Sequence, residues 1–163
     1  MAKKSRGVEI NIDDRDVLTL FRALGSVNAD LRKNTNARLR EAAKECAGTL
    51  AMMLKANVVA SPAPQTRLVA ATARVKSDRT PVVIVGGTKK VGRAYKSRKG
   101  GKVRAPAGQL LWGVEYGDKD SRFASRNESG YWIKPTTKLF MQSKAPGTYY
   151  KAVVEILKDS GVL

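Results

Sequence analysis

The sequence predicts an α+β fold, in which a small antiparallel sheet packs against one long helix and a C-terminal helix. Three observations carry this prediction. Apolar residues recur every three or four positions between residues 29 and 59, which is the period of one helix face. Short β-branched runs follow, separated by Pro- and Gly-containing turns. A second amphipathic segment at 148–159 closes the chain before a terminal glycine.

The N-terminal part of the chain supplies an arm and the long helix. Residues 1–28 form the arm, in which 7–12 (GVEINI) alternate like a short strand. Three acids precede an apolar run and predict a short helix at 13–24, because acids favour the positive end of a helix. Asn28 is a candidate N-cap for the helix at 29–59. The apolar stripe of that helix consists of Leu39, Ala43, Cys46, Leu50 and Met53.

The segments after the long helix predict the sheet and the closing helices. A Ser-Pro-Ala-Pro run ends the long helix, because proline lacks an N–H donor and restricts the residue before it. Residues 69–76 alternate like a half-buried strand, and 82–85 (VVIV) form a more buried one. Residues 130–133 (GYWI) predict another strand. Residues 134–143 then contain a short helix before the terminal one.

Length and composition indicate one domain. The chain has 163 residues, of which 42% are hydrophobic, and this suits a single core spanning residues 1–163. No apolar run approaches the roughly 20 residues that span a bilayer. The basic start, Met1 to Arg6, is not followed by the apolar core of a signal peptide. We therefore expect synthesis in the cytoplasm and no membrane partner.

The residue types argue against an enzyme. Histidine is absent and Cys46 is the only cysteine, which excludes His-based acid–base chemistry and Cys–His or Ser–His nucleophiles. Gly87 and Gly92 have the spacing of a phosphate-binding loop, but Arg93 and Ala94 stand where that motif has Lys and Ser or Thr. The acid clusters lack the spacing of a calcium loop. We expect no catalytic residues, no cofactor and no metal.

Charge is the strongest compositional signal. Thirty-one Lys and Arg against fourteen Asp and Glu give a net charge of +17, which attracts polyanions. Residues 88–108 concentrate this charge, and no acid occurs between Asp78 and Glu115. With four glycines and little apolar surface, 88–108 are predicted to be a mobile extended loop when unbound. The cations of this segment are Lys89, Lys90, Arg93, Lys96, Arg98, Lys99, Lys102 and Arg104.

Three interpretations of the basic segment stay open. Its cations can neutralise DNA phosphates without reading bases, which gives a salt-dependent and sequence-independent affinity. They can also bind an acidic protein neighbour, or remain a solvated charged loop. Tyr95 is the only aromatic residue within the segment, so the aromatic platform on which single strands stack is missing.

Three local patterns, in this order, resemble the neck or tail-completion proteins of long-tailed bacteriophages. The long helix ends in residues 61–68 (SPAPQTRL), similar to that family's helix followed by Pro-x-Thr-Gly-x-Leu; Arg67 stands where the family has Gly. Residues 111–117 (LWGVEYG) resemble its Val-Glu-Phe/Tyr-Gly segment. Residues 131–135 (YWIKP), followed by an amphipathic helix, resemble its closing section. The residues that carry the family-like structural turn are Pro64, Thr66, Leu68, Glu115, Tyr116 and Gly117.

The resemblance covers about residues 30–160, and the basic insertion at 88–108 is not part of it. It implies a virion structural protein that forms a homo-oligomeric, hexameric ring at the head–tail junction. Such a ring joins the head connector or stopper to the tail-tube proteins and borders the DNA channel, where genome DNA could meet the basic loop. The alternative is a small basic protein that binds nucleic acid without sequence preference.

Overall fold

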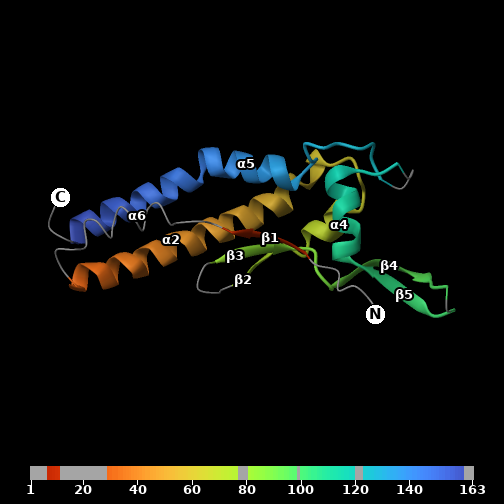
Figure 1. Cartoon of the computed structure of the whole chain (residues 1–163), viewed down its shortest axis with the longest axis horizontal. Helices are drawn as coiled ribbons and strands as arrows, with labels where there is room; N and C mark the ends of the chain where they lie inside the picture. The colour runs from red at the N-terminus through yellow and green to blue at the C-terminus, as the bar shows by residue number, and fades with distance from the viewer. Residues whose placement is uncertain (1–6, 12–28, 77–80, 99, 120–122, 160–163) are drawn as a thin grey trace.

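The computed structural model describes residues 7–11, 29–76, 81–98, 100–119 and 123–159 (Figure 1). Helix α2 (Ala29–Ala56) is its longest element and continues as the short 3-10 helix η1 (Asn57–Ala60). The helix predicted at 29–59 is therefore confirmed, with its last turn tightened. The helix predicted at 13–24 and the Asn28 cap lie outside the described residues.

The stripe predicted on α2 faces the core. Leu39, Cys46 and Leu50 are fully buried and Ala43 is nearly so, whereas Met53 packs against the core while partly exposed. Large apolar side chains at this helical spacing each contribute about 1.5–3 kcal/mol when buried. The stripe therefore holds α2 against the rest of the molecule.

Three antiparallel strands lie beside α2 in the order β1-β3-β2. They are β1 (Val8–Asn11), β3 (Val82–Val85) and β2 (Arg74–Lys76), with β3 in the centre. Val83 and Val85 of β3 are fully buried in the same cluster as the middle of α2. The predicted α+β class, with its antiparallel sheet, long helix and C-terminal helix, is confirmed.

Helices α5 (Ile133–Ser143) and α6 (Ala145–Asp159) run along α2 in Figure 1. Phe140 of α5 is fully buried in the main core, and Ile156 of α6 packs against Leu39 of α2. Proline suits the first turn of a helix, where its missing N–H costs nothing, so α6 begins at Ala145 and not at the predicted residue 148.

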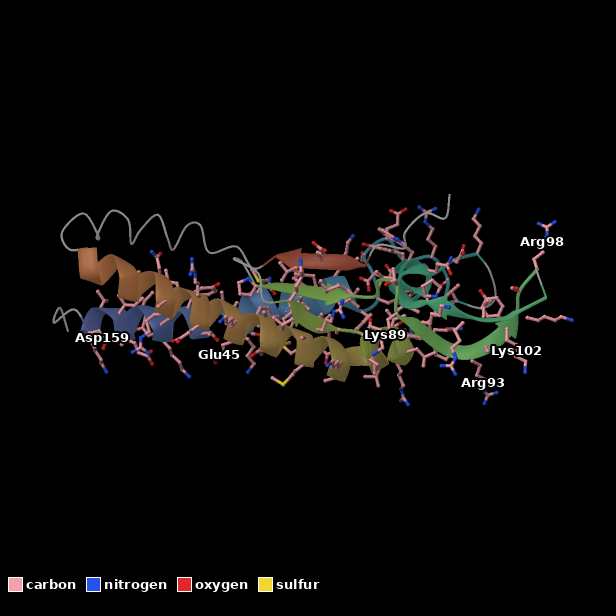
Figure 2. All side chains as sticks on the ribbon, turned by 90° about the horizontal axis from the view of Figure 1, so that it is seen from below. Glu45, Lys89, Arg93, Arg98, Lys102 and Asp159 are labelled. Carbon is pink, nitrogen blue, oxygen red and sulfur yellow. The ribbon has the colours of Figure 1, made fainter. Side chains whose placement is uncertain are left out.

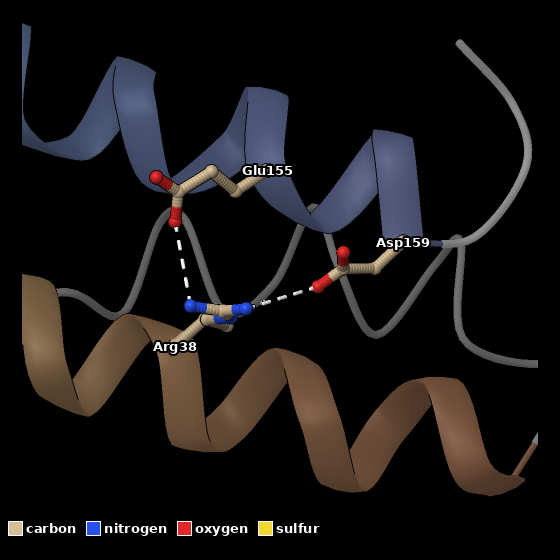
Figure 3. A network of polar contacts seen from close by, with 3 residues as sticks. All are labelled: Arg38, Glu155 and Asp159. Atoms are coloured by element: carbon tan, nitrogen blue, oxygen red, sulfur yellow. Dashed lines mark hydrogen bonds and ion pairs between the residues drawn. The ribbon is translucent and has the colours of Figure 1, made fainter.

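One basic side chain also links α2 and α6. Arg38 lies 3.5 Å from a carboxylate oxygen of Glu155 and 3.3 Å from one of Asp159 (Figure 3). All three side chains are about half exposed, and such pairs contribute little because water and salt screen them. The apolar contacts therefore dominate the packing of these helices.

Two strand predictions need correction. The first half of 69–76 belongs to helix α3 (Thr66–Ala70) and the turn after it, and only β2 is a strand. Its alternation consists largely of alanine, which is small enough for either face and favours helix. The strand predicted at 130–133 does not form, since the N–H groups of Trp132 and Ile133 donate to a side-chain carboxylate instead of a neighbouring strand. The short helix predicted within 134–143 is confirmed.

Within the described ranges, none of the helices is both long enough and apolar enough to span a membrane.

Candidate functional site

The basic segment folds as a β-hairpin, which corrects the prediction of an extended loop at 88–108. Strand β4 (Lys90–Lys96) pairs antiparallel with β5 (Lys102–Pro106) in a two-stranded sheet separate from the first. The hairpin projects from one end of the molecule, away from the free ends of α2 and α6 (Figure 1). Apolar residues that alternate with the cations allow this pairing, whereas composition alone indicated only charge and glycine.

Backbone hydrogen bonds fix both ends of the hairpin. At its base, the N–H of Ala107 donates to the carbonyl of Lys89 at 2.8 Å, and the N–H of Gly108 donates to that of Gly87 at 2.8 Å. At its tip, the N–H of Ser97 donates to the carbonyl of Gly101 at 2.8 Å. Helix α4 (Ala107–Tyr116) begins directly after β5, so the two hydrogen bonds at the base join the first residues of α4 to the start of the hairpin.

A bulge near the base ties the hairpin to α3. The register shifts between Val91 and Tyr95, and Gly92 within this bulge has a φ of +74°, which favours glycine. A Cβ at Gly92 would lie 3.3 Å from Cδ1 of Leu68. Leu68, one of the family-like residues, therefore packs where the hairpin leaves the body.

The register separates the two faces of the hairpin. Lys96 is directly opposite Lys102, and Lys90 is opposite Pro106, so their side chains share a face with that of Arg104 between them. We call Lys90, Lys96, Lys102 and Arg104 the cation face; all four residues are exposed. The alternate positions Val91, Tyr95, Val103 and Ala105 form the apolar face, of which only Tyr95 is classed as exposed.

The remaining described cations of the segment lie at its margins. Lys89 precedes β4, Arg93 lies in the bulge and Arg98 lies at the tip, and all three are exposed. Figure 2 shows Arg93 and Arg98 pointing in opposite directions. The structure thus brings four of the eight predicted cations onto one surface; Lys99 lies outside the described residues.

Behind the hairpin, Glu115 of α4 holds the start of α5. Its carboxylate is buried and accepts hydrogen bonds from three successive backbone N–H groups, those of Trp132 (3.2 Å), Ile133 (2.6 Å) and Lys134 (2.9 Å). The first N–H groups of a helix have no partner within it, and a negative charge there is favourable. Glu115 therefore caps α5 from a distant segment.

Ser61 and Thr66 join the same region to the end of the long helix. The Ser61 hydroxyl donates to the carbonyl of Val114 at 3.0 Å, and the Thr66 hydroxyl donates to Ser61 at 2.8 Å. Both side chains are buried. Arg67 follows in helix α3, so this turn needs no glycine, and Pro64 is exposed just before it.

Two further contacts connect the third family-like segment. The Trp132 indole N–H donates to the carbonyl of Leu54 in α2 at 2.7 Å, and its ring is fully buried. On the surface, the Lys134 ammonium lies 5.0 Å from the centre of the Tyr116 ring, which stacks on Trp112 at 5.3 Å. The three segments of the resemblance therefore meet in space, although 42 residues lie between the first and the second and 13 between the second and the third.

Gly117 ends α4 in a conformation that favours glycine. Its φ is +69°, and a Cβ there would meet the carbonyl oxygens of Ala124 and Ser125. The predicted turn at residues 115–117 is therefore the last turn of α4 and its exit. The reasoning from sequence missed the capping role of Glu115, because capping acids are normally sought next to the helix that they cap.

The described residues include acidic side chains and Cys46, which are residue types that can ligate metals. Among them, no group of three or more His, Cys, Asp or Glu side chains could hold a metal ion. Cys46 is buried in the α2 stripe, and this burial raises the pKa of its thiol and keeps it in the unreactive neutral form.

Comparison of the chain with protein-family models, with curated proteins and with solved structures found no match in any of the three.

Proposed function

We propose that the chain is a structural subunit of a tailed-bacteriophage virion, working as a neck or tail-completion protein. In this proposal, copies form a hexameric ring at the head–tail junction, join the head connector or stopper to the tail tube, and border the DNA channel. The protein is made in the host cytoplasm and incorporated into the virion. The proposal gives it no catalytic role.

The observation that carries the proposal is the meeting of the three family-like segments. Glu115 binds the backbone of residues 132–134, and Ser61 binds the carbonyl of Val114. Residues that are far apart along the sequence are thus joined, since each segment supplies a hydrogen-bond donor or acceptor to another. This connected network supports the proposal, because it gives each of the three family-like segments a structural role at one place in the fold.

The surface also supports assembly. A ring contact is heterologous, so it requires two different patches on one chain. Trp112 is 62% exposed beside a hollow of about 410 Å³ that Phe123 and Arg126 also line. Val59 and Leu139, exposed by 80% and 52%, flank another hollow of about 300 Å³. A second copy of the chain is the occupant that would bury such surfaces.

The exposed cation face also favours a second candidate function, that of a small basic protein that binds nucleic acid without sequence preference. The cation face would suit that function without any ring. The two functions differ in what the loss of the protein does to a phage particle, because only the ring subunit is needed to join heads to tails.

Electron microscopy of a host lysate tests the proposal, after infection by a phage from which the gene for this chain has been deleted. We expect DNA-filled heads beside free tails, and joined infectious particles when the chain is supplied from a plasmid. Tails of irregular length would place the protein at the tail terminus. Normal, infectious particles would overturn the structural proposal and favour the nucleic-acid-binding candidate.

A further inference from the structure

The basic hairpin holds the four residues of the cation face on the opposite side from its aromatic side chain. Lys96 and Lys102 share the cation face, while Tyr95, 53% exposed, lies on the apolar face. The sequence shows only that Tyr95 and the cations are close along the chain; the register shows that Tyr95 and the cation face are on opposite sides. This separation restricts the kind of polyanion that the hairpin can bind.

We infer that the cation face binds the sugar–phosphate backbone of double-stranded DNA, and that the hairpin is not a single-strand binder. This inference deepens the proposed function and rests on it, because the channel of the ring is where a duplex would pass. Of the three interpretations of the basic segment, the inference selects contact with DNA over an acidic protein neighbour or a solvated loop.

The placement of Tyr95 argues against single strands. Proteins that bind single strands contact the backbone with cations while successive bases stack on aromatic side chains of the same groove. A base stacked on Tyr95 would carry its phosphate to the apolar face, away from Lys96 and Lys102. A duplex keeps its bases stacked inside and presents phosphates outward, so the cation face alone suffices.

The register also shows why the cation face favours an anion. Lys96 and Lys102 are directly opposed across the two strands, and like charges in that position destabilise a hairpin. The chain between Asp78 and Glu115 contains no acid that could relieve this repulsion. A phosphate backbone bound along the cation face would relieve the repulsion between these two lysines. In a hairpin that is only solvated, the same repulsion would lower stability with no compensating contact.

The dimensions of the hairpin fit a duplex. The four steps from Lys102 to Pro106 span about 13 Å at roughly 3.3 Å per residue, and the strands lie about 4.8 Å apart. A face of this size can lie along the phosphates that border the major groove, which is about 12 Å wide. The four cations would then neutralise up to four phosphates, which predicts a slope of log affinity against log salt of about −3.6.

The test measures binding of the full-length purified protein to a duplex and to a single strand of equal length, from about 20 to about 200 mM salt. Two triple variants remove the same charge from the same hairpin. The first changes the cation face (Lys96→Gln, Lys102→Gln and Arg104→Gln); the second is the matched control (Lys89→Gln, Arg93→Gln and Arg98→Gln). Thermal unfolding of each variant confirms that it is folded.

We expect the duplex to bind more tightly than the single strand. The first variant should reduce the slope from about −3.6 to about −0.9, leaving one contact from Lys90, and the control should keep most of the slope. Tyr95→Ser should leave duplex binding unchanged. The inference is overturned by tighter single-strand binding that Tyr95→Ser weakens, by equal losses in both triple variants, or by no duplex binding at about 20 mM salt. Binding is scored on purified protein and head–tail joining on phage particles, so each can fail without the other.

Discussion

Replacing Glu115 by alanine probes the network that unites the three family-like segments. The carboxylate is 3% exposed and accepts three backbone hydrogen bonds at the start of α5. Leaving a buried donor without a partner costs about 1–3 kcal/mol, and some of the three would recover a water molecule. We therefore expect Glu115→Ala to lower the free energy of unfolding by about 3–5 kcal/mol, a large part of the stability of a typical domain.

Glutamine at the same position separates charge from shape. The N–H groups of Trp132 and Ile133 both donate to Oε2, whereas that of Lys134 donates to Oε1. The Gln oxygen can replace Oε2, but its NH₂ group would then face the N–H of Lys134. We expect Glu115→Gln to cost about 1–3 kcal/mol, less than alanine.

Urea unfolding followed by far-UV circular dichroism measures these changes, with the midpoint compared at an unchanged slope. Glu128→Ala is the control, because the Glu128 side chain is 85% exposed and such substitutions usually change stability by less than about 0.5 kcal/mol. If Glu115→Ala unfolds at the same urea concentration as this control, then the carboxylate does not hold α5 and the account of the network is wrong.

Three further predictions use the same unfolding assay. Gly130→Ala should cost about 2 kcal/mol or more, because Gly130 has a φ of +77° and a Cβ there would meet the Glu115 carboxylate; a change under about 0.5 kcal/mol would contradict this. Trp132→Phe should cost about 1–3 kcal/mol, since it removes the indole bond to the Leu54 carbonyl, and wild-type stability would refute that role. Burial raises the pKa of Cys46, so stability is full below the pKa of an unfolded thiol and should fall from about pH 8.5 upward in wild type relative to Cys46→Ala. A parallel pH profile in both proteins, or rapid native labelling of the thiol, would contradict that prediction.

Periodicity predicted the helical part of the fold well. The stripe of Leu39, Cys46 and Leu50 lies in a helix of 28 residues, long enough for the pattern to repeat, and all three are fully buried. The run at 82–85 is β-branched throughout and forms the central strand. In both segments the local conformational preference of the residues agrees with their tertiary packing. Secondary structure can be predicted from sequence where these two agree.

The failures have a different cause. Residues 131–133 have strand-forming side chains, but the N–H groups of Trp132 and Ile133 donate to the Glu115 carboxylate. No local sequence pattern reveals an acceptor that is distant along the chain. The basic segment was predicted from its composition as an extended loop, whereas alternation over only a few residues on each side of the turn decides its hairpin. The cations stay a predicted contact surface, and their division into faces depends on the register across a bulge, which the sequence alone does not show.

The central claim is the proposed ring, and electron cryomicroscopy tests it most directly, on intact virions of a tailed phage whose genome carries the gene for this chain. We predict a ring of copies between the head connector and the tail tube. In each copy, the paired helices α2 and α6 should be recognisable, and the cation face should be turned toward the DNA in the channel. A junction fully accounted for by other proteins, in virions from which mass spectrometry finds this chain to be absent, would contradict the account.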